Sequence, residues 1–291
     1  MALNTIQWFP GHMAKTKRLI KECLSSVDIV LELVDARIPK SSKNPDIDTL
    51  SGEKPKLIIM TKASLANPDV TKRWVEYYKS QGKNVVVIDS ALGQGLDALS
   101  AAVREILKEK LQRYSDKGMA GRRIKAMIVG IPNVGKSSLI NRLAGSKKAK
   151  VENRPGVTLN KQWVPTEIGL DLLDTPGVLW PKFEDETVGF NLAATGAIKD
   201  AILDTEEIAM LLAYKLLRVS GKDFAARYKL DFDEAMELDS YDLFRLIGKK
   251  RGFLISGGDV NHARTAEMLL EEFRSAKIGR ISLESPEDVP V

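Results

Sequence analysis

The sequence predicts a doubly wound α/β domain followed by a smaller domain made of helices alone. Three short apolar runs, each rich in Val, Ile and Leu, occupy residues 28–35, 56–60 and 84–88. Each run stops at polar or small residues, as the strands of a buried parallel sheet do. Helical periodicity is found at residues 71–81 and 96–114. This alternation of strands with helices is typical of an open parallel sheet with helices on both faces.

Two further strands and a helix complete the predicted α/β domain. Residues 124–129 and 170–174 are apolar runs of strand length, and residues 136–143 have the pattern of a helix. Beyond residue 180 the character of the sequence changes, and the remaining patterns are mainly helical. The sequence therefore predicts an α/β domain at 1–180 and a helical domain at 181–291.

The start of one C-terminal helix has a recognisable signal. Asp204-Thr205-Glu206-Glu207 resembles a capping box, and the apolar positions after it suit a helix to about residue 219. A second helix is predicted at residues 262–276.

Composition indicates a globular cytoplasmic protein. The chain has 291 residues, of which 44% are apolar and 29% charged. No stretch approaches the roughly 18 consecutive apolar residues of a spanning helix, so we expect no membrane partner. The first residues lack the basic start and apolar core of a signal peptide. Cys23 is the single cysteine, which excludes an intrachain disulfide and favours a reducing compartment.

Positive charge is concentrated in one segment. Residues 101–150 contain thirteen Lys or Arg against three acidic residues, which gives this segment a net charge of +10 within a chain of +5. Such an excess can bind the phosphate backbone of a nucleic acid. The alternative is a solvated helix face that serves solubility.

A phosphate-binding loop is predicted between the fourth strand and the helix after it. Residues 130–137 match G-x-x-x-x-G-K-[ST], and the flanking strand and helix make a chance match in a glycine turn a poor alternative. Backbone N–H groups of such a loop surround phosphates at a helix N-terminus. Lys136 would reach the β and γ phosphates, and the Ser137 hydroxyl would coordinate Mg²⁺. The candidate nucleotide-binding residues here are Asn133, Val134, Gly135, Lys136, Ser137 and Ser138.

Two downstream segments are candidate partners of this loop. Asp174-Thr175-Pro176-Gly177 ends the fifth predicted strand. An Asp there can hold Mg²⁺, and the Gly177 N–H can meet the γ-phosphate. Between the two lies Arg154-Pro155-Gly156-Val157-Thr158, in which Thr158 would close over Mg²⁺ and the γ-phosphate as a mobile switch. A plain surface turn is the alternative.

The base-recognition element lies in an unusual place. No Asn-Lys-x-Asp follows Gly177. The nearest candidate is upstream, at Thr61-Lys62-Ala63-Ser64, and Asp89-Ser90 provides a second base-contacting loop. The order is base loops first, phosphate loop second and Mg²⁺ loop third, which is a circular permutation of a GTPase domain.

With these residues the sequence resembles the circularly permuted GTPases, and among them the bacterial ribosome biogenesis GTPase A (YlqF) family. The likeness covers nearly the whole chain. Further matching segments are Gln7-Trp8-Phe9-Pro10-Gly11-His12-Met13-Ala14-Lys15, Val34-Asp35-Ala36-Arg37-Ile38-Pro39, the run from Asp174 to Glu186, and Thr195-Gly196-Ala197-Ile198-Lys199-Asp200.

The resemblance implies a function and several residue roles. It implies a GTP hydrolase, with GTP, GDP and Mg²⁺ as ligands, that acts in late assembly of the large (50S) ribosomal subunit. Ribosomal RNA and ribosomal proteins would be its partners, and DNA would not. The helical domain would contact ribosomal RNA. His12 would orient the attacking water, and Asn133 is a candidate K⁺ ligand, although Asn at this position also suits a turn.

Two departures leave other functions open. Thr61 and Ser64 replace the Asn and Asp of the family's base loop, so the carboxylate that accepts hydrogen bonds from guanine is missing and guanine selectivity should fall. Val178 stands where many GTPases have a water-orienting Gln, so the ribosome should stimulate hydrolysis. An RNA-binding assembly scaffold with weakened guanine selectivity and a general NTPase are the alternative functions.

Overall fold

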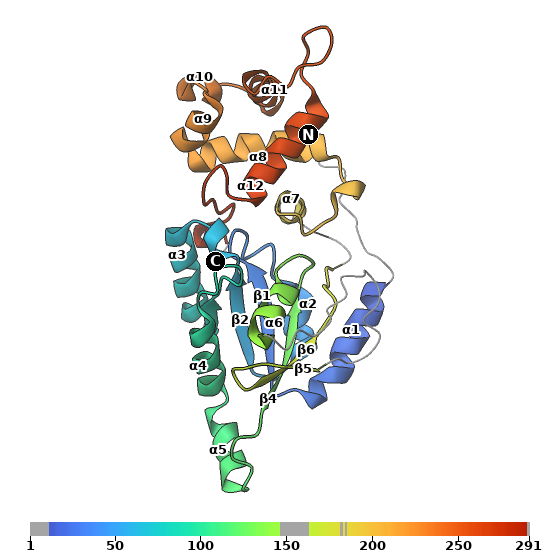
Figure 1. The fold of residues 1–291 in the computed structure, drawn as a ribbon, viewed down its shortest axis with the longest axis vertical. Helices are drawn as coiled ribbons and strands as arrows, with labels where there is room; N and C mark the ends of the chain where they lie inside the picture. The colour runs from blue at the N-terminus through green and yellow to red at the C-terminus, as the bar shows by residue number, and fades with distance from the viewer. Residues whose placement is uncertain (1–11, 146–162, 181–182, 184, 290–291) are drawn as a thin grey trace.

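The computed structural model describes residues 12–145, 163–180, 183 and 185–289. A six-stranded sheet with helices on both faces forms the α/β part, and a group of helices lies beyond one end of the strands (Figure 1). The sheet has the order β3-β2-β1-β4-β6-β5. Its strands are β1 Ile29–Asp35, β2 Lys56–Thr61, β3 Val85–Val87, β4 Ile124–Gly130, β5 Trp163–Pro165 and β6 Leu170–Asp174.

All strands run parallel except β5, which pairs antiparallel with β6. The five predicted strands are confirmed, and the predicted doubly wound α/β class with them. The strand β5 was not predicted from the sequence. Its three residues include Pro165, which makes it too short for a clear alternating pattern.

The two faces of β1 bury different clusters of apolar side chains. Ile29, Leu31 and Leu33 point to one cluster, and Val30 and Val34 point to two others on the opposite face. Successive side chains of β1 alternate between two faces that are both buried, which explains why its sequence is a continuous apolar run.

Within the described residues, six helices accompany the sheet. They are α1 His12–Cys23, α2 Pro45–Ser51, α3 Pro68–Ser80, α4 Leu96–Ile106, α5 Lys108–Asp116 and α6 Lys136–Ala144. The helices α4 and α6 contribute to the cluster under Leu31, while α1, α2 and α3 cover the other face. The single helix expected over residues 96–114 is wrong. The chain leaves helical geometry at Leu107, which is buried against the sheet, and α5, none of whose residues is buried, begins after it.

The strand order reverses between β1 and β4. From β1 the chain winds outward through β2 and β3, and it then returns to place β4 and β6 on the other side of β1. In open α/β sheets, ligands bind outside the carboxyl ends of the strands at such a switch point. The topology therefore points to the loops after β1 and β4, independently of any sequence motif.

The helical part follows the sheet in the chain. Its helices are α7 Glu186–Ala194, α8 Thr205–Ser220, α9 Lys222–Tyr228, α10 Phe232–Met236, α11 Ser240–Lys250 and α12 His262–Arg274. The helices expected from residues 205 and 262 are confirmed, and the Asp204 side chain caps α8 by accepting from the N–H groups of Glu206 and Glu207. The helix α8 packs against α11 and α12. No helix among the described residues is long and apolar enough to cross a membrane.

A buried ion pair holds the carboxyl end of β1. Arg37 donates from Nε and Nη2 to the two carboxylate oxygens of Asp35, at 3.0 and 2.7 Å. Both side chains are almost fully buried. Lys62 Nζ lies 3.0 Å from Asp35 Oδ2. Burial opposes ionisation of Asp35, but Arg37 and Lys62 outweigh it and hold the pKa of the carboxyl well below its usual range.

This ion pair makes a prediction about stability. Asp35→Asn keeps the shape of the side chain but leaves the Arg37 charge buried without its partner, so it should lower the free energy of unfolding by about 3–5 kcal/mol. Urea denaturation measures the change. The control is Arg73→Ala, which breaks the exposed ion pair with Glu287 and should cost about 1 kcal/mol or less. Equal losses in the two variants would contradict the prediction.

Candidate nucleotide-binding site

The predicted phosphate loop connects β4 to α6 at the switch point. Gly130 has φ of 153°, and a Cβ at this position would lie 2.8 Å from the Leu33 carbonyl oxygen of β1. Only glycine fits so close to the neighbouring strand. Ser137 and Ser138 lie in the first turn of α6, whose N-terminus favours anions. The loop thus has the conformation and the position that a phosphate site requires.

The Lys136 ammonium lies inside this loop. Its Nζ donates to the carbonyl oxygens of Gly130 at 3.0 Å and Ile131 at 2.7 Å. Burial lowers the pKa of Lys136 to about 8, and the charge of Asp174 partly offsets this effect. Phosphate oxygens would favour the charged form and raise the pKa again. Lys136 is therefore a buried cation suited to an anionic ligand.

The loop after β6 packs directly on the phosphate loop. Val178 N–H donates to the Gly130 carbonyl at 3.1 Å, and the Thr175 hydroxyl donates to the Ile128 carbonyl at 2.6 Å. A Cβ at Gly177 would lie 2.7 Å from Pro132 N and 3.1 Å from Lys136 Nζ. The Gly177 backbone therefore lies within reach of any phosphate that Lys136 binds. The Val178 side chain points away, into the core.

The residues present fit a bound Mg²⁺. Asp174 and Ser137 offer hard oxygen donors at the ends of β6 and the phosphate loop. Among the described residues no group of three His, Cys, Asp or Glu side chains forms a closed metal site. Mg²⁺ is usually held by one or two protein groups with phosphates and waters. The donor set therefore suits a nucleotide-bound Mg²⁺.

The side chains of two predicted catalytic residues, Thr158 and His12, lie outside the described part of the chain. His12 is the first residue of α1. Their roles stay predictions.

Thr61 joins the predicted base loop, residues 61–64, to the phosphate loop. Its hydroxyl is buried and contacts the carbonyl oxygens of Val134 at 2.6 Å and Val34 at 3.0 Å. Lys62 follows in a left-handed conformation with φ of 57°, and its ammonium pairs with Asp35. Through Thr61 and Lys62 the base loop is thus bound both to the end of β1 and to the phosphate loop after β4. No local sequence pattern indicates these contacts.

Asp89 brings a carboxylate to the base loop although Ser64 has none. The Ser64 N–H donates to Asp89 Oδ2 at 2.8 Å, and the Leu92 N–H donates to Oδ1 at 2.9 Å. Burial opposes ionisation of Asp89, but hydrogen bonds from the side chain and backbone of Ser64 and from the backbone of Leu92 lower its pKa. The structure therefore brings Asp89 into contact with Ser64, so that the two segments predicted as base loops, residues 61–64 and Asp89-Ser90, lie side by side.

Asn133 connects the phosphate loop to the helical part. Its φ of 57° is left-handed, which confirms the turn role. Its side-chain amide donates to the Gly196 carbonyl, in the turn after α7, at 2.7 Å. The amide N–H₂ is engaged in this contact, so the amide oxygen is the group that a K⁺ ligand would use. The K⁺ role stays a proposal.

Fold and site together define a P-loop nucleoside triphosphatase in which the base loops precede the phosphate loop. The family described as "50S ribosome-binding GTPase" matches residues 125–221. The ribosome biogenesis GTPase A of Priestia megaterium is 50% identical over 285 residues, which cover 98% of this chain and 98% of that protein. The chain belongs to the ribosome biogenesis GTPase A family and is a GTP hydrolase.

Solved structures agree with this assignment. GDP-bound TM YlqF and GNP-bound YlqF from T. maritima align with TM-scores of 0.67 and 0.64, at 28% and 29% sequence identity. The alignments cover 93% and 94% of this chain and 100% of those chains. The family resemblance predicted from the sequence is confirmed.

The contact between Ser64 and Asp89 predicts how guanine selectivity can be raised. Ser64→Asp alone would place a second carboxylate beside Asp89, and like charges repel. Ser64→Asp with Asp89→Asn should therefore tighten GDP binding about tenfold while ADP binding stays nearly constant. Thr61 is left unchanged because its hydroxyl ties two loops together.

Calorimetric titration with GDP and ADP measures this effect, and Asp89→Asn alone is the control. If the single Ser64→Asp variant gains as much as the double variant, the two carboxylates do not interfere.

Lys136 makes a second prediction for this site. Lys136→Ala removes the buried charge that faces the phosphates and should abolish GTP turnover. Lys136→Met, which keeps the apolar stem, should be equally inactive while it melts closer to the wild type. Phosphate release and thermal unfolding are the two measurements. Normal turnover in either variant would contradict a role for Lys136 in binding the phosphates.

Proposed function

We propose that this GTPase binds the immature large ribosomal subunit and assists a late step of its assembly, hydrolysing GTP to GDP and phosphate there. The observation that carries the proposal is a basic projection, defined as residues 108–123. The names of the similar family and relatives, a 50S ribosome-binding GTPase and a ribosome biogenesis GTPase A, support it.

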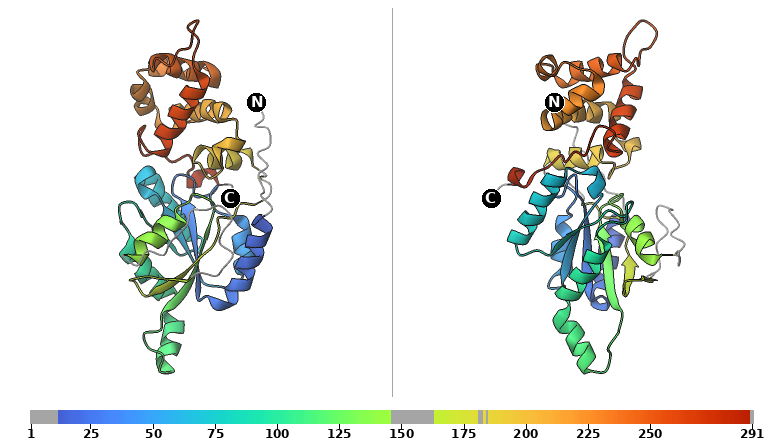
Figure 2. Two further views of the ribbon diagram at one scale, coloured as in Figure 1. Left: turned by 45° about the vertical axis from the view of Figure 1, so that its right-hand side comes forward. Right: turned by 60° about the vertical axis from the view of Figure 1, so that its left-hand side comes forward.

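The projection extends beyond the sheet, at the end opposite the phosphate loop. It consists of α5 and the loop that leads into β4, and it stands clear of the body of the protein (Figure 2). The phosphate loop leaves the other end of β4. A partner bound at this projection therefore leaves the nucleotide site accessible.

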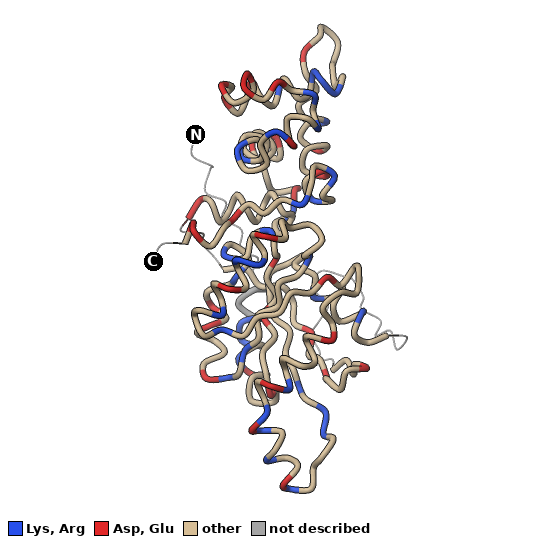
Figure 3. The backbone as a smooth tube through the Cα atoms, turned by 90° about the vertical axis from the view of Figure 1, so that its left-hand side faces the viewer, with Lys and Arg blue, Asp and Glu red and all other residues tan. Residues whose placement is uncertain are grey.

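Lys and Arg line the projection on both sides, with a few acidic residues among them (Figure 3). Its basic residues are Lys108, Lys110, Arg113, Lys117, Arg122 and Arg123. Nucleic-acid phosphates bind Lys and Arg without regard to sequence and release counterions. The helix α5 buries none of its own residues, and although Lys110 pairs with Asp28, its exposed basic side chains suit such a contact.

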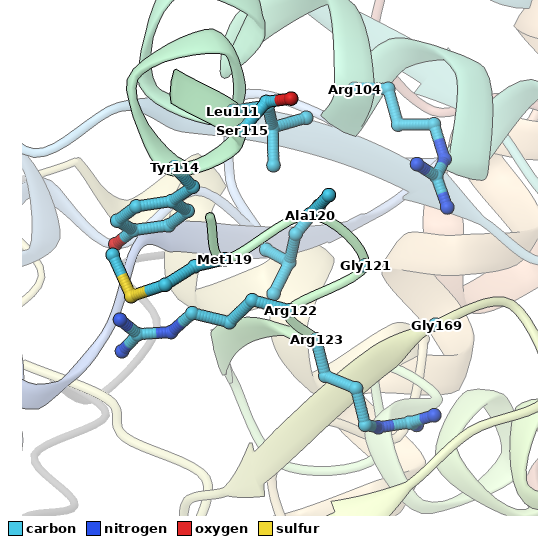
Figure 4. A pocket seen from close by; sticks show the side chains of 11 residues that line it. Arg104, Leu111, Tyr114, Ser115, Met119, Ala120, Gly121, Arg122, Arg123 and Gly169 are labelled. Atoms are coloured by element: carbon cyan, nitrogen blue, oxygen red, sulfur yellow. The ribbon is translucent and has the colours of Figure 1, made fainter. Parts of the chain in front are cut away.

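A hollow of about 290 Å³ lies at the base of the projection. Figure 4 shows Arg104, Arg122 and Arg123 around it, with Arg122 beside Tyr114. The Arg122 guanidinium lies 4.7 Å from the Tyr114 ring centre, where the ring face attracts the cation. The hollow is far from the phosphate loop, so it is not the nucleotide site. It adds ordered cations to the surface proposed for RNA.

The roles proposed at the nucleotide site follow from its geometry. Lys136 and the Gly177 N–H would stabilise charge on the phosphates, and Ser137, Thr158 and Asp174 would hold Mg²⁺, which neutralises phosphate charge when bound. Asn133 would hold K⁺. The remaining proposed nucleotide contacts are Thr61, Lys62, Ala63, Ser64, Asp89, Ser90, Val134, Gly135 and Ser138.

No group at position 178 orients the attacking water, because Val178 is buried in the core. We propose that His12 does so and that the bound ribosomal subunit places it. The helical domain is proposed as a second RNA contact, and the cytoplasm as the location.

Turnover with and without large ribosomal subunits tests the proposal. The subunits should accelerate hydrolysis of GTP and not of ATP. The triple variant Lys108→Ala, Arg113→Ala, Lys117→Ala should keep the basal rate, because these residues are remote from the phosphate loop. Its binding to the subunit should weaken, and the slope of log affinity against log salt should fall by about 2–3.

The matched control removes three exposed lysines of the α/β part that lie outside the projection, Lys72, Lys79 and Lys83. Sedimentation binding at several salt concentrations compares the two variants. An unchanged salt slope in the projection variant would show that this surface faces solvent, whatever the control does.

A further inference from the structure

An extended segment after α12 passes between the helical part and the α/β part. It covers residues 280–284 and leads to the short 3-10 helix η4 (Pro286–Asp288), which lies beside α3 (Figure 2). Ile281 and Leu283 are buried in the main apolar cluster. The alternate residues Arg280, Ser282 and Glu284 contact the α/β part. This period of two is that of an extended strand with two different faces.

Arg280 binds the backbone of the base loop. Its Nε donates to the Ala66 carbonyl at 3.0 Å, and its Nη2 donates to the Ala63 carbonyl at 2.9 Å. These carbonyls lie at the start and just beyond the end of the 3-10 turn Ala63–Leu65. The planar guanidinium holds two acceptors at a fixed spacing, which a lysine ammonium cannot do. Arg280 therefore fixes the shape of this turn.

The segment that carries Arg280 is itself firmly anchored. The Glu284 carboxylate is nine-tenths buried and accepts from the backbone N–H groups of Lys40 and Ser41 and from the Asn191 amide. The Glu284 carbonyl accepts from Trp74 Nε1 at 3.2 Å. Because these bonds fix the segment on two sides, the position of the Arg280 guanidinium is fixed as well.

The base loop needs such an external support. Thr61 turns its hydroxyl inward to Val134, and Ser64 carries no carboxylate for the base. Lys62 holds a left-handed backbone that costs free energy for any residue with a Cβ. Contact with a base therefore depends on where the backbone of residues 61–66 lies, and two of its carbonyls are set by Arg280.

We propose that Arg280 is a positioning residue for guanine recognition, which makes the nucleotide preference of the α/β part depend on the helical part. The inference rests on the proposal that residues 61–64 contact the base. It requires no contact between Arg280 and the nucleotide.

Arg280→Ala and Arg280→Lys test it in the full-length protein. Arg280→Ala should weaken GDP binding about tenfold, because two charged hydrogen bonds to the loop are lost, and should leave ADP binding within about twofold. Arg280→Lys, which restores the charge but not the fork, should give an intermediate GDP affinity. The KM for GTP should rise while kcat stays close to the wild type.

The control is Arg73→Ala, which removes the exposed ion pair between Arg73 of α3 and Glu287 of η4 and does not touch the base loop. It should leave the ratio of GDP to ADP affinity unchanged. Calorimetry gives the affinities, and thermal unfolding reports stability. If GDP and ADP affinities fall together in Arg280→Ala, or neither changes, Arg280 is a structural contact only. A wild type that binds ADP as tightly as GDP would instead overturn the proposal that residues 61–64 recognise guanine.

Discussion

The buried carboxylate of Asp35 is the constraint on which the arrangement of this protein depends. It ends β1 at the switch point of the sheet, binds Arg37 through both oxygens and holds the ammonium of Lys62. Arg37 also lies over the Phe273 ring of α12, 5.4 Å from its centre, and its carbonyl accepts from Leu283 N–H. The ionised Asp35 carboxylate therefore positions both the base loop, through Lys62, and the contact with the helical part, through Arg37. A buried charge of this kind tolerates no loss of its partner.

The strands and the phosphate loop were predictable because local chemistry specifies them. A run such as residues 124–129 is apolar at every position that a central strand buries, and the glycines and Lys136 follow at fixed spacing. The break at Leu107 was not predictable, because helical periodicity continues across it and only the packing of Leu107 on the sheet decides where the helix ends. The strand β5 was not predictable, because three residues are too few to show the alternation of apolar and polar side chains that marks a strand.

The contacts that shape the site connect residues distant in sequence, and pattern reasoning does not reach them. The Asp35-Ala36-Arg37 segment belongs to the family resemblance, but nothing in its local sequence indicates that Asp35 pairs with Lys62. The Asn133 contact with Gly196 and the Ser64 contact with Asp89 are of the same kind. Thr61 shows the limit most clearly. Its hydroxyl joins the base loop to the phosphate loop, a contact that the replacement of Asn by Thr does not by itself indicate.

The permuted order of the motifs has a consequence for synthesis of the chain. The base loop leaves the translating ribosome early. The Arg280 guanidinium that binds the Ala63 carbonyl of this loop belongs to a residue 217 positions later in the sequence. Contacts of such long separation form late in folding, since a large loop must close first. A nascent chain in which the sheet and the phosphate loop have folded still lacks the Arg280 contact with its base loop. Translation of the helical part therefore has to precede assembly of the complete site.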